Sequence, residues 1–353
     1  MNLDDVERFR ELDPSAMLNK IDTLPDQLEA AWKMGHELPL VPVVRLRHIV
    51  IAGMGGSAIG GDLLTAYSSR HARAPIVVWR DYDLPAFAAG PETLLIASSH
   101  SGDTEEVLSS FEKGISQGVT IMAVTTGGEL GRRARRSGVA LWRFDHPGPP
   151  RTAVAYSFGL LLAAVHRLGV IADPSEELAD AVSAMRRQQA HLRAEVRAVQ
   201  NPAKRVAGQL MERWPVILGA GVLAPVARRW RTQINEVAKA VAQSEELPEA
   251  DHNLVAGLSQ PEPLLARIVT VFLRGSLDDQ RHRARIEATR QLLMVEGINT
   301  DFIDAAGETR MAQLWTCLHF GDYVAYYLAM AYGLDPTPIA AIEALKERLR
   351  SGA

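Results

Sequence analysis

Short apolar runs alternate with segments of helical periodicity along most of the chain, and this alternation restricts the fold more than any other feature. The runs at 49–52, 94–97 and 215–218 contain no polar side chain. Strands that are apolar on both faces are typical of parallel sheets buried between helices, because parallel strands need helical crossovers. The sequence therefore predicts an α/β fold of doubly wound parallel sheets.

The alternation stops once and then restarts, which indicates two domains in a chain of 353 residues. We expect similar architecture in the two α/β halves, with helical segments around them. The predicted parts are an N-terminal helical arm (1–40), a first domain (41–172), a long helical connector (173–205), a second domain (206–334) and a C-terminal helix (335–353). Within the second domain we interpret the acidic stretch 244–253 as a loop.

Composition excludes several classes of function. The net charge of −4 gives no reason to expect nucleic-acid binding. The single cysteine, Cys317, lies in the apolar context LWTCLHF and is predicted to be buried; it excludes an internal disulfide and a thiolate metal cluster. No His, Asp or Glu spacing suggests another metal site. The charged N-terminus and the lack of a long apolar run predict a cytoplasmic protein that does not enter a membrane.

A glycine-rich turn follows the first apolar strand, at 53–61. Glycines allow backbone N–H groups to approach an anion, and the next helix, expected at 58–67, would present its positive N-terminus there. Gly55, Gly56 and Ser57 are thus candidates for binding a ligand. The same residues also match G-x-G-x-x-A, a pattern typical of dinucleotide-binding proteins. The turn alone is therefore compatible with either an anionic ligand or a dinucleotide.

A second polar loop, SSHSGDTEEV, follows the strand at 93–97. A capped helix start explains one hydroxyl, whereas Ser99, Ser101 and Thr104 supply three around a glycine. Three hydroxyls at a helix N-terminus suit a phosphate monoester, which accepts many hydrogen bonds. We favour phosphate binding over a merely capped turn, and assign no role to His100 or Asp103.

These motifs together resemble a known family. The S-x-S-G-x-T loop is similar to the phosphate loop of sugar isomerase (SIS) domains. From about Leu12 onward the chain resembles the bifunctional phosphoglucose/phosphomannose isomerase family in IAGMGGSAIGGDLL, PPRTAVAY, QINEVAKA, DHNLVAG, HFGDYVAYYLA and DPTPIAAIEALKERL. The resemblance implies two SIS domains, no nicotinamide or other cofactor, and interconversion of glucose 6-phosphate or mannose 6-phosphate with fructose 6-phosphate. A non-catalytic sugar-phosphate sensor and an isomerase of another phosphosugar remain alternatives.

The resemblance also implies roles for four residues that the local pattern alone leaves as surface residues. Glu236 matches the family's base and Arg151 the arginine that stabilises the enediolate. His252 matches the ring-opening histidine, which in related isomerases comes from the partner subunit and implies a homodimer. Lys346 matches a lysine that acts near the ring oxygen.

Three positions depart from the family pattern. Leu254 replaces a glutamate, Val237 an asparagine and Asp103 an asparagine. A carboxylate at 103 beside a bound phosphate is unfavourable unless it points away.

Overall fold

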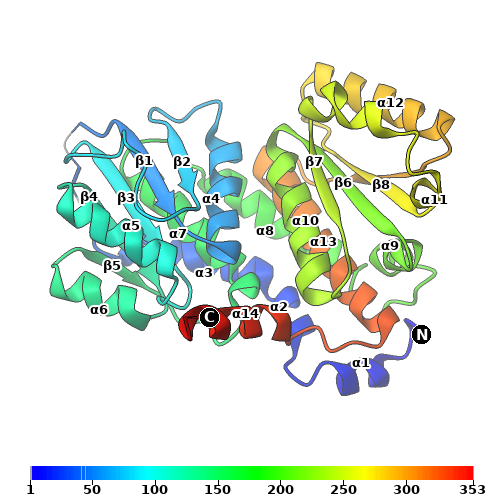
Figure 1. The fold of residues 1–353 in the computed structure, drawn as a ribbon, viewed down its shortest axis with the longest axis horizontal. Helices are drawn as coiled ribbons and strands as arrows, with labels where there is room; N and C mark the ends of the chain where they lie inside the picture. Colours follow the sequence, from blue (N-terminus) through cyan, green and yellow to red (C-terminus); the bar gives the residue numbers. More distant parts are fainter. Residues whose placement is uncertain (1, 41, 44, 353) are drawn as a thin grey trace.

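Two parallel sheets form the frame of the protein (Figure 1). The computed structural model describes residues 2–40, 42–43 and 45–352. The first sheet has the order β2-β1-β3-β4-β5 and the second the order β7-β6-β8-β9. The strands of the first are β1 (His48–Ala52), β2 (Ile76–Trp79), β3 (Thr93–Ser98), β4 (Thr120–Thr125) and β5 (Ala140–Arg143). Those of the second are β6 (Trp214–Ala220), β7 (Gln243–Leu247), β8 (Ile268–Arg274) and β9 (Asn299–Asp304).

Helices cover both faces of the first sheet, as the apolar strands predict. Ile49 and Ile51 of β1 face the inner helices α4 (Gly55–Ser68) and α7 (Val154–Arg167). Val50 and Ala52 face the outer helices α5 (Glu105–Ser116) and α6 (Gly128–Arg136). This alternation follows from the two-residue period of a strand, and it confirms the doubly wound arrangement.

The second sheet repeats this plan. Its inner face packs on α10 (Ala224–Val237) and α13 (Arg310–Tyr332), and its outer face on α12 (Gln280–Val295). The inner helices of both sheets share one hydrophobic core, so the two halves are joined by packed side chains and not by a linker alone.

The contact between α10 and α13 is unusually close at one point. A Cβ on Gly321 would lie 2.1 Å from Nε1 of Trp230, so only glycine fits there. The Trp230 indole donates to the carbonyl of Cys317 at 3.0 Å, which satisfies a buried donor. Cys317 itself is buried, as predicted.

The N-terminal arm is three helices: α1 (Val6–Leu12), α2 (Met17–Asp22) and α3 (Leu24–Glu37). Most of its apolar face is buried: Met17, Ile21, Leu24 and Leu28 are at most 2% exposed, and Trp32 is partly buried. The arm contacts both halves, since α3 packs on α7 and α2 packs on α13. His319 of α13 forms a hydrogen bond with the carbonyl of Ile21 at 2.9 Å.

The structure differs from the predicted secondary structure in three places. The connector is not one long helix: α8 (Ser175–Gln189) and α9 (Pro202–Leu210) are separated by turns. Asn201 causes the break, because its side chain caps α9 and donates to the carbonyls of Leu192 and Arg193. The acidic stretch predicted as a loop contains β7, and α4 begins at Gly55 rather than at 58.

The C-terminal helix α14 (Ala340–Arg350) has no buried side chain. In Figure 1 it lies below the first sheet, coloured red. Among the described residues, no helix combines the length and the apolar character required to cross a membrane.

Candidate active site

The loops that follow β1, β3, β4 and β5 meet at the carboxyl edge of the first sheet. All four strands run in the same direction, so their following loops share one edge. This edge is where open parallel sheets bind ligands. The residues predicted from the glycine loop, the hydroxyl loop and Arg151 all belong to these segments.

The hydroxyl loop is closed by its own side chains. Ser99 Oγ lies 2.8 Å from Thr104 Oγ1 and accepts a hydrogen bond from the N–H of Gly102 at 3.0 Å. Ser101 is exposed and accepts from the N–H of Asp103 at 3.2 Å. Thr104 is the N-cap residue of α5, yet its side chain makes no capping hydrogen bond. The N–H groups of the first turn therefore keep their capacity to bind an anion.

Asp103 has a structural role that the sequence does not reveal. Its Oδ1 accepts from the N–H of Glu129 at 2.9 Å, in the first turn of α6. The carboxylate thus stabilises the N-terminus of a neighbouring helix. One oxygen of the carboxylate is therefore engaged by α6, while its negative charge remains next to the hydroxyl loop.

The hydroxyl loop also packs tightly on the loop after β4. A Cβ on Gly102 would lie 2.0 Å from the carbonyl oxygen of Gly127, and one on Gly128 would lie 2.2 Å from that of Ser101. Gly102 and Gly128 have positive φ angles of 76° and 64°. Both the space and the backbone conformation therefore require glycine.

Ser57 connects the glycine loop to the hydroxyl loop. Its Oγ accepts from the N–H of His100 at 3.2 Å. On its other side, Gly56 packs against the backbone before Arg151, where an added Cβ would lie 2.5 Å from the carbonyl oxygen of Pro150. Gly55 is exposed beside them at the start of α4. The glycine loop therefore lies between the hydroxyl loop and Arg151.

An aromatic cluster lies behind these loops. The His100 ring is 5.8 Å from Phe144 and 5.6 Å from His146, and Phe144 stacks on Tyr156. Burial lowers the pKa of His100, and it lowers the pKa of His146 to about 4. Burial therefore disfavours the charged form of both imidazoles, and the His100 ring packs within this cluster.

Arg151 and Glu236 come from opposite halves of the molecule and meet between them. Arg151 Nη1 lies 3.4 Å from Glu236 Oε2, and Arg151 is 2% exposed. Its Nη2 donates to the carbonyls of Pro336 and Thr337, which precede α14. Burial lowers the pKa of the arginine, and the glutamate opposes this effect. The Glu236 side chain is 27% exposed, so its carboxylate remains accessible.

Lys239 is a further cation at this place, which the sequence analysis did not include among the candidate site residues. Its Nζ donates to the carbonyls of Glu236 and Val237 at 2.8 and 3.2 Å, at the end of α10. Burial lowers its pKa to about 8, and the Arg151 guanidinium acts in the same direction. One lysine after a helix carries no local signal of function, which is why pattern reasoning overlooked it.

His252 does not join this group within one chain. Glu236 lies near the end of α10, which returns to the amino edge of the second sheet. His252 follows the five residues of β7, at the carboxyl edge. Five strand residues span about 16 Å, so the two side chains lie at opposite edges of the sheet. His252 is exposed there.

Lys346 is also exposed, on α14. Within the described ranges its side chain has no hydrogen bond or ion pair, so the structure does not link it to Arg151 or Glu236. The segment just before α14 does contact Arg151, through the Pro336 and Thr337 carbonyls that accept from its guanidinium.

Two departures from the family pattern fit the local packing. Val237 is fully buried in the shared core. Leu254 packs against the core under the outer face of the second sheet. Both positions favour apolar side chains here.

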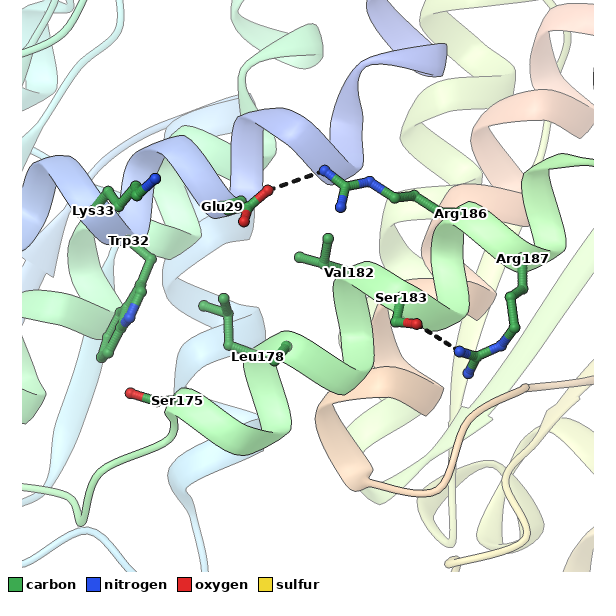
Figure 2. A pocket seen from close by; sticks show the side chains of 10 residues that line it. Glu29, Trp32, Lys33, Ser175, Leu178, Val182, Ser183, Arg186 and Arg187 are labelled. Atoms are coloured by element: carbon green, nitrogen blue, oxygen red, sulfur yellow. Dashed lines mark hydrogen bonds and ion pairs between the residues drawn. The ribbon is translucent and has the colours of Figure 1, made fainter.

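A wide groove lies away from these loops, between α3 and α8 (Figure 2). Trp32, Leu178 and Val182 line it. Its arginines are already engaged: Arg186 pairs with Asp26 and Glu29, at 2.6 and 3.0 Å, and Arg187 donates to Ser183. The groove shares no residue with the loops described above, and its two arginines already have partners.

Comparisons with known proteins show the family to which the chain belongs. The profile of the bacterial phospho-glucose isomerase C-terminal SIS domain matches residues 199–349. A bifunctional phosphoglucose/phosphomannose isomerase from Caldicellulosiruptor bescii is 35% identical over 94% of this chain and 98% of its own. A protein of the same name from Aquifex aeolicus is 32% identical over 86% of this chain and 91% of its own.

A solved structure shares the whole fold. The hypothetical protein TT0462 from Thermus thermophilus superposes with a TM-score of 0.76 over 98% of this chain and 93% of its own, at 17% identity. The tandem arrangement of two sheets is therefore shared at low sequence identity, and the matching family model identifies its second half as an SIS domain.

Proposed function

Because this chain belongs to the bifunctional phosphoglucose/phosphomannose isomerase family, we propose that it interconverts glucose 6-phosphate and mannose 6-phosphate with fructose 6-phosphate at the Arg151–Glu236 site. The reaction is an intramolecular oxidation and reduction. The aldehyde carbon gains the hydrogen that its neighbour loses, so proton transfer suffices and no redox cofactor is needed.

The hydroxyl loop anchors the substrate phosphate in this proposal. Ser99, Ser101, Thr104 and the first turn of α5 supply hydrogen bonds, and the helix N-terminus favours the negative charge. Gly55, Gly56 and Ser57 line the path from this loop to Arg151. Binding energy from the remote phosphate then positions the reacting carbons.

Glu236 is the base. It removes the proton from C2 of the open-chain aldose, and the electron pair forms the C1–C2 double bond of a cis-enediolate. The same carboxyl returns the proton to C1, while the hydroxyl proton of O2 is transferred to O1, so that C2 becomes the carbonyl carbon of the ketose. Arg151 stabilises the negative oxygens of the intermediate, because its buried guanidinium acts where water is excluded. The pair at 3.4 Å is the observation that carries this proposal.

His252 opens the sugar ring, and it does so from a second subunit of a homodimer. The separation of His252 from Glu236 across the sheet supports this arrangement, since one chain alone does not bring the two together. Lys346 completes the site near the ring oxygen. Its exposed helix follows the segment that Arg151 holds, which supports a place close to the substrate.

Glu236→Gln tests the reaction. In a coupled assay with each hexose 6-phosphate, we expect turnover to fall about 10³-fold while fructose 6-phosphate still binds. Glu37→Gln, at the end of α3, is the matched control and retains activity. If the wild-type protein binds fructose 6-phosphate but does not turn it over, the sensor alternative replaces the enzyme.

A mixing experiment tests the shared site. Chains carrying Glu236→Gln and chains carrying His252→Asn are each expected to be inactive alone. After denaturation and refolding together, about one quarter of wild-type activity should return, because half of the dimers contain one intact composite site of two. Failure of the mixture to recover activity would place both residues in one subunit.

A further inference from the structure

Arg151 is held at two points by the same helix of the other half. Glu236 of α10 contacts its guanidinium at 3.4 Å. Arg229, seven residues earlier on α10, donates through Nη2 to the carbonyl oxygen of Arg151 at 2.7 Å. Residues seven apart on a helix lie on one face, so α10 presents both contacts together. The backbone and the side chain of Arg151 are therefore fixed relative to the same rigid element.

Arg229 is itself fixed by Asp322 of α13. The contact is two-pronged, with Nε 3.1 Å from Oδ1 and Nη2 2.8 Å from Oδ2. Both side chains are 2% exposed. A buried ion pair of this kind contributes little net stability compared with apolar packing of equal volume, because desolvation of the charges is costly. Stability alone therefore does not account for this ion pair between α10 and α13.

We propose that Arg229 and Asp322 are positioning residues, which hold the Arg151 main chain so that its guanidinium faces the substrate carbons beside Glu236. Neither residue touches the substrate. The inference rests on the proposed function. It adds a series of buried contacts from Asp322 of α13 through Arg229 of α10 to Arg151.

The neighbouring contacts restrict Arg151 in the remaining directions. The Gly56 backbone packs against Pro150 and Arg151, and the carbonyls of Pro336 and Thr337 accept from Nη2. Without Arg229 the carbonyl of Arg151 would lose a charged donor, and the short 3-10 helix at Pro150–Thr152 would be free to shift away from Glu236. Displacement of a catalytic group by about 1 Å costs on the order of 100-fold in rate.

Asp322→Asn is the first test, because it preserves shape and removes the charge. We expect kcat to fall about 10- to 100-fold with KM for fructose 6-phosphate changed less than about threefold, since the phosphate loop is untouched. A phosphorylated hydroxamate that mimics the planar enediolate should lose affinity by the same factor as kcat/KM. Arg229→Lys should behave alike, because one ammonium does not replace a forked guanidinium.

A double-mutant cycle separates positioning from a structural role. If Asp322 acts through Arg151, Asp322→Asn has no further effect on kcat in an Arg151→Ala background. If the loss of kcat in the double variant instead equals the product of the two single-variant losses, the proposal is overturned. Should Asp322→Asn not fold, the cycle is run with Arg229→Lys. Far-ultraviolet circular dichroism and Tm are recorded for each variant.

Asp4→Asn is the matched control. It removes the negative charge that lies 3.3 Å from Nζ of another buried cation, Lys204. We expect it to lower Tm without changing kcat. If Arg151→Ala and Glu236→Gln are fully active, the proposed function fails. If those two are inactive while Asp322→Asn and Arg229→Lys match wild type, only the positioning role fails.

Discussion

Arg151 Nη1 and Glu236 Oε2 lie 3.4 Å apart although 85 positions separate them in the sequence. One follows the last strand of the first sheet and the other lies near the end of α10 in the second half. The pair exists only when the two halves are packed together, so any change that loosens this packing acts on the site as well as on stability.

Thr104→Val removes one hydroxyl of the phosphate loop with little change in shape. Loss of a hydrogen bond to a charged group costs about 1.5–3 kcal/mol, so we expect KM for each hexose 6-phosphate to rise about 10- to 100-fold. Steady-state kinetics should show kcat nearly unchanged. Thr65→Val, which removes a hydroxyl bonded to the Gly61 carbonyl within α4, is the control and leaves KM unaltered.

Asp103→Asn removes a negative charge next to the proposed phosphate site. The amide oxygen still accepts from Glu129 N–H, so α6 keeps its N-terminal contact. We expect KM to fall about two- to fivefold, with the greatest effect at low ionic strength where charge repulsion is least screened. Asp103→Ala should instead lower the free energy of unfolding by about 1 kcal/mol. An increased KM in Asp103→Asn would contradict this explanation.

Asp251→Ala tests the support of the loop that carries His252. Asp251 accepts from Arg285 at 2.7 Å and from Thr289 at 2.6 Å, and thereby attaches this loop to α12. We expect kcat to fall about tenfold, with a loss of about 1–2 kcal/mol in stability. Asp304→Ala, which breaks the pair with Arg274 at 2.7 and 2.8 Å, should leave kcat unchanged. Equal kcat values for the two variants would show that the loop needs no such anchor.

Acid should destabilise the protein partly through His146. Its folded pKa of about 4 lies below the unfolded value of 6.5, so the unfolded chain binds more protons between these values. Stability therefore decreases as the pH falls from 6.5 to 4, by roughly 2 kcal/mol for this half-buried group. Denaturant titrations of His146→Gln should show a shallower pH dependence. Identical slopes for variant and wild type would mean that other groups dominate.

The sequence was sufficient to predict the sheets because buried parallel strands are apolar runs. It failed for β7, whose QSEEL sequence forms an edge strand with partly exposed side chains. An edge strand is partly exposed and does not need an apolar run. The apolar composition from which the other strands were predicted is therefore absent in β7.

The candidate residues could be proposed one at a time from the sequence, but their arrangement could not. The hydroxyl loop pointed to Ser99 and Thr104, and only the family resemblance pointed to Arg151 and Glu236. The buried pair of Arg229 and Asp322 has no local signal, since its meaning depends on the packing of α10 on α13. The roles of His252 and Lys346 stay predictions, because neither side chain meets the others within the described part of one chain.

The glycine contacts between the loops after β3 and β4 have a thermodynamic consequence. The two loops pack so closely that neither Gly102 nor Gly128 has room for a Cβ. Each loop therefore fixes the backbone of the other in the ligand-free protein. The conformational entropy of this loop is then lost during folding and not during binding. Inorganic phosphate should therefore bind with a small unfavourable entropy of ordering, and its heat of binding should vary little with temperature.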